Sequence, residues 1–196
     1  MDWDHCYQQG KTPWEKGEPS PPLLAYLKRD ALAAASLLVP GCGWGHDVRA
    51  IAGFLPETRV VGLDISPTAL ERARQFPTVG QECYVEEDLF ALPASMRGEF
   101  DVVWEHTCYC AIDPERRDEY VVAVHGALRE KGEFLAIFFL DPYDDDHPSG
   151  GPPFGATQEE IRGRFDPFFD WKEDWVPSEA YPGREGREWM ARLVKR

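Results

Sequence analysis

Short apolar runs alternate along the chain with segments in which apolar residues recur every three to four positions. The runs predict strands, because a strand buried on both faces reads as nearly continuous apolar sequence, and the other segments predict amphipathic helices. Strands are predicted at 36–39, 59–63, 82–85, 100–104, 133–140, 168–176 and 188–195. Helices are predicted at 2–9, 21–35, 47–55, 67–75, 114–128 and 158–165.

The alternation of strands and helices predicts a fold class. It is typical of a Rossmann-like, doubly wound α/β fold with a mostly parallel sheet, here of seven strands. The last two strands are expected to form an antiparallel hairpin at the C-terminal edge. Neither an internal repeat nor a linker is evident in the 196 residues, so a single domain spanning 1–196 is expected.

Composition and charge exclude several classes of protein. The formal net charge is −14, from 35 acidic and 21 basic residues, whereas nucleic acids and acidic membranes attract basic surfaces. The sequence has no basic-then-apolar leader and no apolar run near the roughly 20 residues of a spanning helix, so a cytoplasmic protein is expected. The five cysteines show no CxxC spacing, which predicts neither a disulfide framework nor a metal site. No obligate protein partner is evident.

The stretch LLVPGCGWGHD at 37–47 joins an apolar run, glycines at alternate positions and a segment with helical spacing. It is interpreted as a strand, a tight turn and a helix N-terminus. Glycine lets backbone approach a ligand closely, and the helix offers unpaired N–H groups. An anion or a polar cofactor is therefore expected there, although such a turn can also occur without a ligand.

Acidic residues follow three successive predicted strands. Asp64 closes the second strand, Asp88 follows the third and Glu105 closes the fourth. The C-terminal ends of parallel strands line one crevice, so these carboxylates are expected to face the same ligand as the glycine turn. Asp64 suits the two hydroxyls of a ribose, and Asp88 suits an exocyclic adenine amine. His46 stands where a dinucleotide fingerprint has its third glycine, which weakens the interpretation as an NAD site.

Several motifs together resemble a known family. They are Thr12-Pro13-Trp14 with Gly17, LVPGCGWGHD (38–47), VVGLDIS (60–66), EDLF (87–90), CAIDPERR (110–117) and GGPPF (150–154). In this order they are similar to the S-adenosylmethionine-dependent methyltransferases of the thiopurine S-methyltransferase superfamily, and most similar to its thiol and halide methyltransferase branch. The resemblance spans nearly the whole chain.

The resemblance implies S-adenosylmethionine as the cofactor and requires no metal. It places the cofactor against Trp3, Tyr7 and Trp14 of an N-terminal helical cap (1–22), Gly41 and Gly43 at the methionine end, Asp64 at the ribose, Asp88 and Leu89 at the adenine, and Glu105. Spacing alone would favour an aromatic staple that holds residues 1–22 to the core. The family resemblance favours a lid instead.

The acceptor side departs from the family. His106 stands where the thiol and halide enzymes tend to have tyrosine and the thiopurine enzymes arginine. Thr107, Cys108 and Tyr109 follow it and are expected to line the acceptor pocket. The Pro-, Gly- and Asp-rich loop at 141–156 is expected to cover the active site, because long structureless loops in compact domains are usually functional.

The resemblance implies in-line transfer of a methyl group to a small soft nucleophile: a thiol, sulfide, halide or metalloid species. His106 is the candidate catalytic residue, either as a base that deprotonates the nucleophile or as a cation that attracts it, and a histidine bonded to a loop carbonyl is the alternative. Two other functions stay open at this point. One is an S-adenosylmethionine-binding protein without transferase activity, and the other is an NAD-linked oxidoreductase.

Overall fold

The predicted doubly wound α/β fold is confirmed by a computed structural model, which describes residues 1–30, 32–143 and 151–196. One seven-stranded sheet runs in the order β3-β2-β1-β4-β5-β7-β6. The strands are β1 (Ser36–Pro40), β2 (Arg59–Asp64), β3 (Gln81–Glu86), β4 (Phe100–His106), β5 (Leu128–Phe139), β6 (Phe169–Trp175) and β7 (Glu188–Lys195). β1 to β5 are parallel, and β7 is antiparallel to both of its neighbours.

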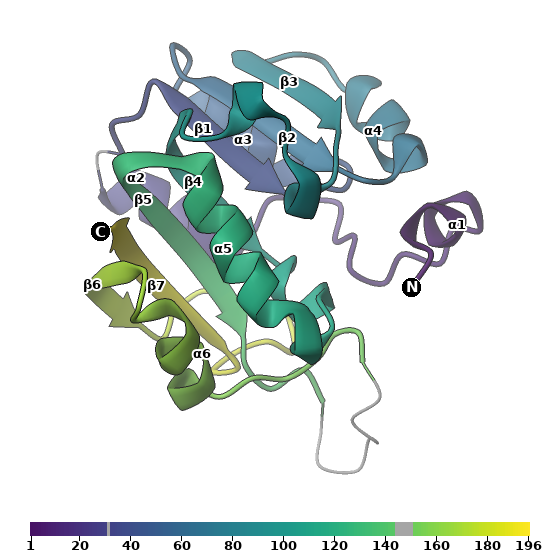
Figure 1. The fold of residues 1–196 in the computed structure, drawn as a ribbon. Helices are drawn as coiled ribbons and strands as arrows, with labels where there is room; N and C mark the ends of the chain where they lie inside the picture. The colour runs from purple at the N-terminus through teal and green to yellow at the C-terminus, as the bar shows by residue number, and fades with distance from the viewer. Residues whose placement is uncertain (31, 144–150) are drawn as a thin grey trace.

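Helices cover both faces of this sheet (Figure 1). They are α1 (Trp3–Gln8), α2 (Pro21–Arg29), α3 (His46–Phe54), α4 (Pro67–Arg74), α5 (Arg117–Ala127) and α6 (Gln158–Phe165). α5 and α6 pack on one face, in a core cluster that includes Tyr120 and Phe165. α2 and α3 pack on the other face, in a second cluster that includes Leu23 and Ile51. The two apolar layers explain why the central strands read as continuous apolar runs.

Helix starts follow their sequence signals closely. Ser66 accepts a hydrogen bond from the Ala69 N–H at the start of α4, and Pro67 occupies the first helical position. Thr157 caps α6 in the same way by accepting from the Glu160 N–H. The helix predicted at 21–35 was wrong at its end, because α2 stops at Arg29. Leu32 lies in the core beyond the helix, so its apolar character reflects burial rather than helical periodicity.

β5 is longer than predicted. The strand was expected to begin at Glu133 after a break at Lys131 and Gly132, whereas it begins at Leu128. Lys131 has a positive φ of 62°, and the pairing with β4 shifts register between Phe100 and Val102. The predicted break is therefore an irregularity inside the strand.

The predicted C-terminal hairpin is confirmed, with β6 at the edge of the sheet and β7 inside it. β7 also pairs with β5 from Glu133 to Phe139. Figure 1 shows α1 standing clear of the two helical layers, on the side of α4. Asp4 of α1 accepts hydrogen bonds from the Ser66 hydroxyl (2.7 Å) and the Thr68 N–H (3.0 Å), which ties the N-terminal segment to the start of α4.

Candidate active site

The turn between β1 and α3 depends on its glycines. Gly41, Gly43 and Gly45 have φ values of 60°, 51° and 71°, in the left-handed region that other residues rarely adopt. A Cβ on Gly43 would collide with the Glu15 carboxylate and lie 2.8 Å from the Tyr7 hydroxyl. A Cβ on Gly41 would lie 3.2 Å from the Cys108 sulfur. The turn is thus closely covered on one side by the N-terminal segment and on the other by the segment after β4.

Asp64 lies at the end of β2, directly against this turn. Its carboxylate accepts the Gly43 N–H and the Ser66 N–H, each at 2.9 Å. The side chain is buried, and burial raises the pKa of Asp64 although the two amides favour the charged form. A carboxylate can accept about four hydrogen bonds, and three backbone amides, those of Gly43, Ile65 and Ser66, act on this one, so Asp64 can still accept a hydrogen bond from a ligand.

The three aromatic residues predicted as a cap lie together. The Trp14 indole N–H donates to the Tyr7 hydroxyl (2.9 Å), and Trp3 meets Trp14 edge-on with ring centroids 5.3 Å apart. Tyr7 in turn donates to Glu15 (2.9 Å), which also accepts the Trp44 N–H (2.9 Å) from the glycine turn. The cap is therefore hydrogen-bonded to the turn.

Glu15 is a residue that the sequence interpretation missed. It is largely buried, and burial together with the nearby charge of Asp64 raises its pKa. Its position immediately after Thr12-Pro13-Trp14 was the available signal. Glu15 and Asp64 place two buried carboxyl groups around Gly43.

The predicted adenine site lies at the end of β3. Asp88 is exposed, and its carboxylate accepts the Phe90 N–H (2.9 Å) at the start of a 3₁₀ turn, Leu89–Ala91. Leu89 is buried in the core cluster under α5. The structure therefore leaves Asp88 accessible to a ligand and turns the Leu89 side chain inward.

Glu105 does not open onto the crevice as expected. Its side chain is 1% exposed and accepts the Tyr109 N–H (2.8 Å) and the Tyr120 hydroxyl. Burial raises the pKa of Glu105 to about 7. Side chains alternate along a strand, so Glu105 faces α5 while Trp104 and His106 face α3. Glu105 thereby holds the segment that follows β4.

His106 lies at the end of β4 beside Asp47, in the first turn of α3. Its Nδ1 is 2.9 Å from the Asp47 carboxylate, which also accepts the Trp104 indole N–H (2.9 Å) and the Ser20 N–H (2.8 Å). The ring stacks on Tyr181, with centroids 6.0 Å apart. Asp47 was missed by the sequence interpretation, although it ends the glycine motif.

The residues predicted to line the acceptor pocket, Thr107, Cys108 and Tyr109, do not all lie in the same place. Cys108 lies against Gly41 and so stays near the glycine turn, and Thr107, which has a positive φ of 63°, directly precedes it. Tyr109 was placed wrongly, because it is 2% exposed and packs edge-on against Tyr120 and Phe138 in the core. A short 3₁₀ helix begins at Tyr109, and the Tyr109 side chain points away from the glycine turn.

The predicted cover at 141–156 falls partly on 144–150, which lie outside the described residues. The remainder is tied to neighbouring elements. Phe154 donates its N–H to the Cys110 carbonyl (2.6 Å). Arg117, which is 1% exposed, donates to the carbonyls of Phe154 (3.0 Å) and Gly155 (3.1 Å) and to the Glu160 carboxylate (2.9 Å). Arg117 therefore fixes the end of this loop beside the segment after β4.

Replacing Arg117 by methionine is expected to lower the free energy of unfolding by about 3 kcal/mol, because it removes the buried guanidinium from its ion pair with the partly exposed Glu160 and leaves two carbonyls unbonded. Urea unfolding measures the difference. Arg116→Met is the matched control, since its guanidinium is 49% exposed and pairs with Glu119 at the surface; we expect a change within about 0.5 kcal/mol. Equal effects in the two variants would contradict this role of Arg117.

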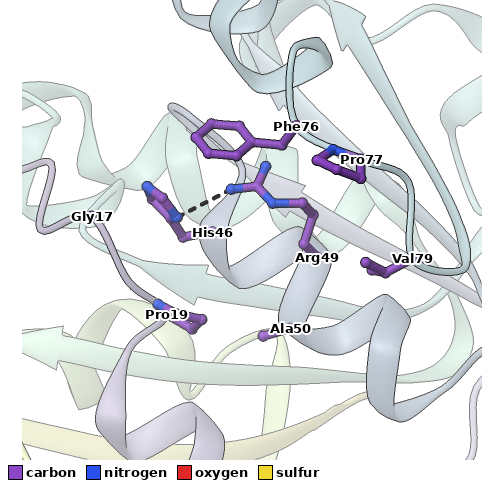
Figure 2. A pocket seen from close by; sticks show the side chains of 8 residues that line it. All are labelled: Gly17, Pro19, His46, Arg49, Ala50, Phe76, Pro77 and Val79. Atoms are coloured by element: carbon purple, nitrogen blue, oxygen red, sulfur yellow. Dashed lines mark hydrogen bonds between the residues drawn. The ribbon is translucent and has the colours of Figure 1, made fainter.

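A pocket of about 400 Å³ opens on the outer side of α3 (Figure 2). It is lined by Gly17, Pro19, His46, Arg49, Ala50, Phe76, Pro77 and Val79. The Arg49 guanidinium lies 4.0 Å from the centre of the Phe76 ring and 3.1 Å from Nδ1 of His46. The pocket therefore adjoins the glycine turn through His46 without containing the carboxyl groups of the site.

Metal sites and membrane-spanning helices are both absent from the described residues. Within 1–30, 32–143 and 151–196, no three histidine, cysteine or acidic side chains are grouped so as to hold a metal ion. None of the helices in those ranges combines the length and the apolar character needed to cross a membrane.

Comparison with known proteins gives consistent matches. The sequence model of the thiopurine S-methyltransferase family matches residues 1–183. Thiocyanate methyltransferase 1 of Brassica oleracea is 36% identical over 166 residues, covering 81% of this chain and 70% of the relative. Probable thiol methyltransferase 2 of Arabidopsis thaliana is 33% identical over 198 residues, covering 98% and 84%.

A solved structure has the same fold. The 1,6-didemethyltoxoflavin-N1-methyltransferase of Burkholderia thailandensis superposes with a TM-score of 0.72 at 21% identity, covering 99% of this chain and 85% of the other. At that identity the likeness concerns the fold.

Proposed function

Because the chain belongs to the thiopurine S-methyltransferase family, whose members are S-adenosylmethionine-dependent enzymes, we propose that it methylates the sulfur atom of a small thiol or of sulfide. The names of its relatives, a thiocyanate and a thiol methyltransferase, support sulfur as the accepting atom. Halides and metalloid species carry no such support and are the alternatives. The observation that carries the proposal is the cluster of Gly43, Asp64 and the cap around one turn.

The residues around the turn fit S-adenosylmethionine. Glu15 and Asp64 are buried carboxyl groups with raised pKa values, and a cation between them would offset the cost of their burial. When bound, S-adenosylmethionine supplies a methyl group on a positively charged sulfur. Gly43, which has no side chain, lets the Glu15 carboxylate and the Tyr7 hydroxyl lie close against the backbone of the turn.

Each element of the site receives a role in this proposal. Gly41 and Gly43 approach the methionine end, Asp64 accepts a hydrogen bond from the ribose, and exposed Asp88 accepts the adenine amine. The cap of Trp3, Tyr7 and Trp14 excludes water. The protein's task is then mainly to align the reactants and keep the site dry.

The test is a panel of acceptors with mass spectrometry of the products. We expect a small alkyl thiol or hydrogen sulfide to be methylated faster than thiocyanate, iodide or a selenium oxyanion. Calorimetry with S-adenosylmethionine and with NADH accompanies the panel. Tight cofactor binding without methylation of any acceptor would favour a binding protein, and tight binding of NADH alone would favour an oxidoreductase.

A further inference from the structure

His106 and Asp47 form a pair whose proton positions are fixed by their surroundings. Two of the partners of Asp47, the Ser20 N–H and the Trp104 indole N–H, can only donate. Burial raises the pKa of Asp47, but His106 and these hydrogen bonds outweigh it and the pKa is lowered. Asp47 is therefore an anion that accepts from its neighbours, and a neutral His106 ring carries its proton on Nδ1.

The other ring nitrogen of His106 is left with a lone pair. Its Nε2 is buried and has no hydrogen-bond partner among the residues that the structure describes. Tyr181 covers one face of the His106 ring, but its hydroxyl group donates a hydrogen bond to the Glu18 carbonyl (2.7 Å) and none to Nε2. A buried polar atom without a partner is costly, which points to an occupant that brings a donor.

The pair lies beside the proposed methyl-transfer site. Asp47 follows the glycine turn in the first turn of α3, and His106 lies two residues before Cys108, which contacts Gly41. Asp47 and His106 are thus each joined within a few residues of the chain to the glycine turn, which forms the methionine end of the proposed cofactor site.

We propose that Asp47 holds His106 as a general base and that this makes the enzyme select neutral, protonated thiols over preformed anions; the inference rests on the proposed function. The S–H bond of the acceptor breaks, its proton passes to Nε2, and the electron pair stays on sulfur. The resulting thiolate forms the new S–C bond as the bond between the methyl group and the sulfonium of S-adenosylmethionine breaks, and the electron pair of that bond stays on the sulfur of the leaving S-adenosylhomocysteine. The imidazolium then releases its proton to water when the site opens.

The charges around the pair favour a neutral acceptor. The carboxylates around His106 and the Tyr181 ring stacked on it are Asp47, Glu18 and Glu188, and Arg184 pairs with Glu188 at 3.1 Å. Glu105 lies on the opposite face of β4, and burial raises its pKa to about 7. The chain as a whole has a formal charge of −14. A preformed anion would enter against this potential, whereas a neutral thiol enters without opposition and is ionised in place.

The first experiment compares two thiols in His106→Gln. An alkyl thiol is protonated at neutral pH, whereas an acidic aromatic thiol is already a thiolate. We expect kcat/KM for the alkyl thiol to fall roughly 10²–10⁴-fold and that for the aromatic thiol to change less than about threefold. In the variant, the alkyl-thiol rate should rise about tenfold per pH unit, because only the preformed thiolate reacts.

The matched control is His125→Gln. His125 lies in the last turn of α5 and packs against Phe168 and Phe169, on the other face of the sheet. The His125→Gln variant should have the same kcat/KM as the unmodified enzyme with both thiols. If His106→Gln lowered both thiol activities equally, or neither, a general base at His106 would be ruled out.

The second experiment tests Asp47 as the positioning residue. Nitrogen-15 NMR of the enzyme with S-adenosylhomocysteine should show the Nδ1–H tautomer of His106, and Asp47→Asn should reduce its population. Ultraviolet absorbance should show thiolate when the unmodified complex binds the alkyl thiol, and less thiolate in Asp47→Asn. Asp101→Asn is the control, because Asp101 is also buried and accepts the N–H groups of Ala35 and Ser36.

These outcomes separate the two proposals. An unmodified enzyme that methylates no thiol contradicts the proposed function. An enzyme that methylates thiols, yet prefers thiocyanate or iodide, or shows the Nε2–H tautomer in the unmodified protein, contradicts only the role of Asp47 and His106. Circular dichroism confirms that each variant is folded before the comparison is made.

Discussion

Alanine at position 43 is expected to lower the affinity for S-adenosylmethionine about a hundredfold while leaving the sheet folded. The new Cβ would occupy the space of the Glu15 carboxylate and crowd the Tyr7 hydroxyl. Glu15 would then lose its bond to the Trp44 N–H, and the cap would detach from the turn. A hydrogen bond to a charged group contributes about 1.5–3 kcal/mol, which corresponds to roughly 10–100-fold in affinity. Calorimetry gives the affinity, and limited proteolysis of residues 1–22 reports the cap.

Gly98→Ala separates crowding from backbone strain. Gly98 has a φ of 68°, close to that of Gly43, and a Cβ there would meet nothing within 4 Å. Both variants should lose about 1–2 kcal/mol of unfolding free energy from the strained backbone. Only Gly43→Ala should lose cofactor affinity and expose the cap, so equal affinities would contradict the contact between cap and turn.

The free energy of unfolding is expected to fall by about 3 kcal/mol between pH 4.5 and pH 7 through Glu105 alone. Its pKa is raised from 4.5 to about 7 by burial, so the folded state holds a proton that the unfolded state has already released. This contribution is complete below pH 4.5 and is lost as the pH rises through 7. The contribution of Glu105 is measured by urea unfolding across this pH range, as the unfolding free energy of the unmodified protein minus that of Glu105→Gln.

Tyr120→Phe provides a second measurement on the same carboxyl group. The Tyr120 hydroxyl donates to Glu105 and favours its charged form. Without it the pKa of Glu105 should rise further, and the loss of stability should extend to higher pH. A pH dependence that is identical in the unmodified protein and in Glu105→Gln would show that this carboxyl group does not drive the effect.

The sequence was informative where local chemistry decides the structure. Ser66 and Pro67 mark the start of α4 because capping acts over a few residues. The buried strands could be predicted because both faces of the sheet are covered, which leaves an apolar run. Asp64 could be placed against the glycine turn because parallel strand ends meet at one edge of the sheet.

Polar contacts between residues far apart in the chain could not be predicted from the sequence. Asp47 meets Ser20 and His106, which lie 27 and 59 residues away in the chain. Glu15 meets the glycine turn across 29 residues. A carboxylate of this kind looks like a solvated side chain until tertiary structure brings its donors together, so neither partnership leaves a local pattern.

Glu105 was misplaced for a different reason. The expectation grouped acidic residues by their position at strand ends and ignored which face each side chain takes. Trp104 and His106 lie on one face of β4 and Glu105 on the other, as the two-residue period of a strand requires. Applied to β4, that period would have separated Glu105 from the crevice.

The place of β7 inside the sheet has a consequence for synthesis in the cell. β5 is made well before β7, and its edge from Glu133 to Phe139 stays unpaired until residues 188–195 have left the ribosome. An apolar strand with a free edge is a template for pairing with other chains. The nascent protein therefore passes through a stage at which chaperones are expected to bind β5, and slower translation between the two strands would prolong it.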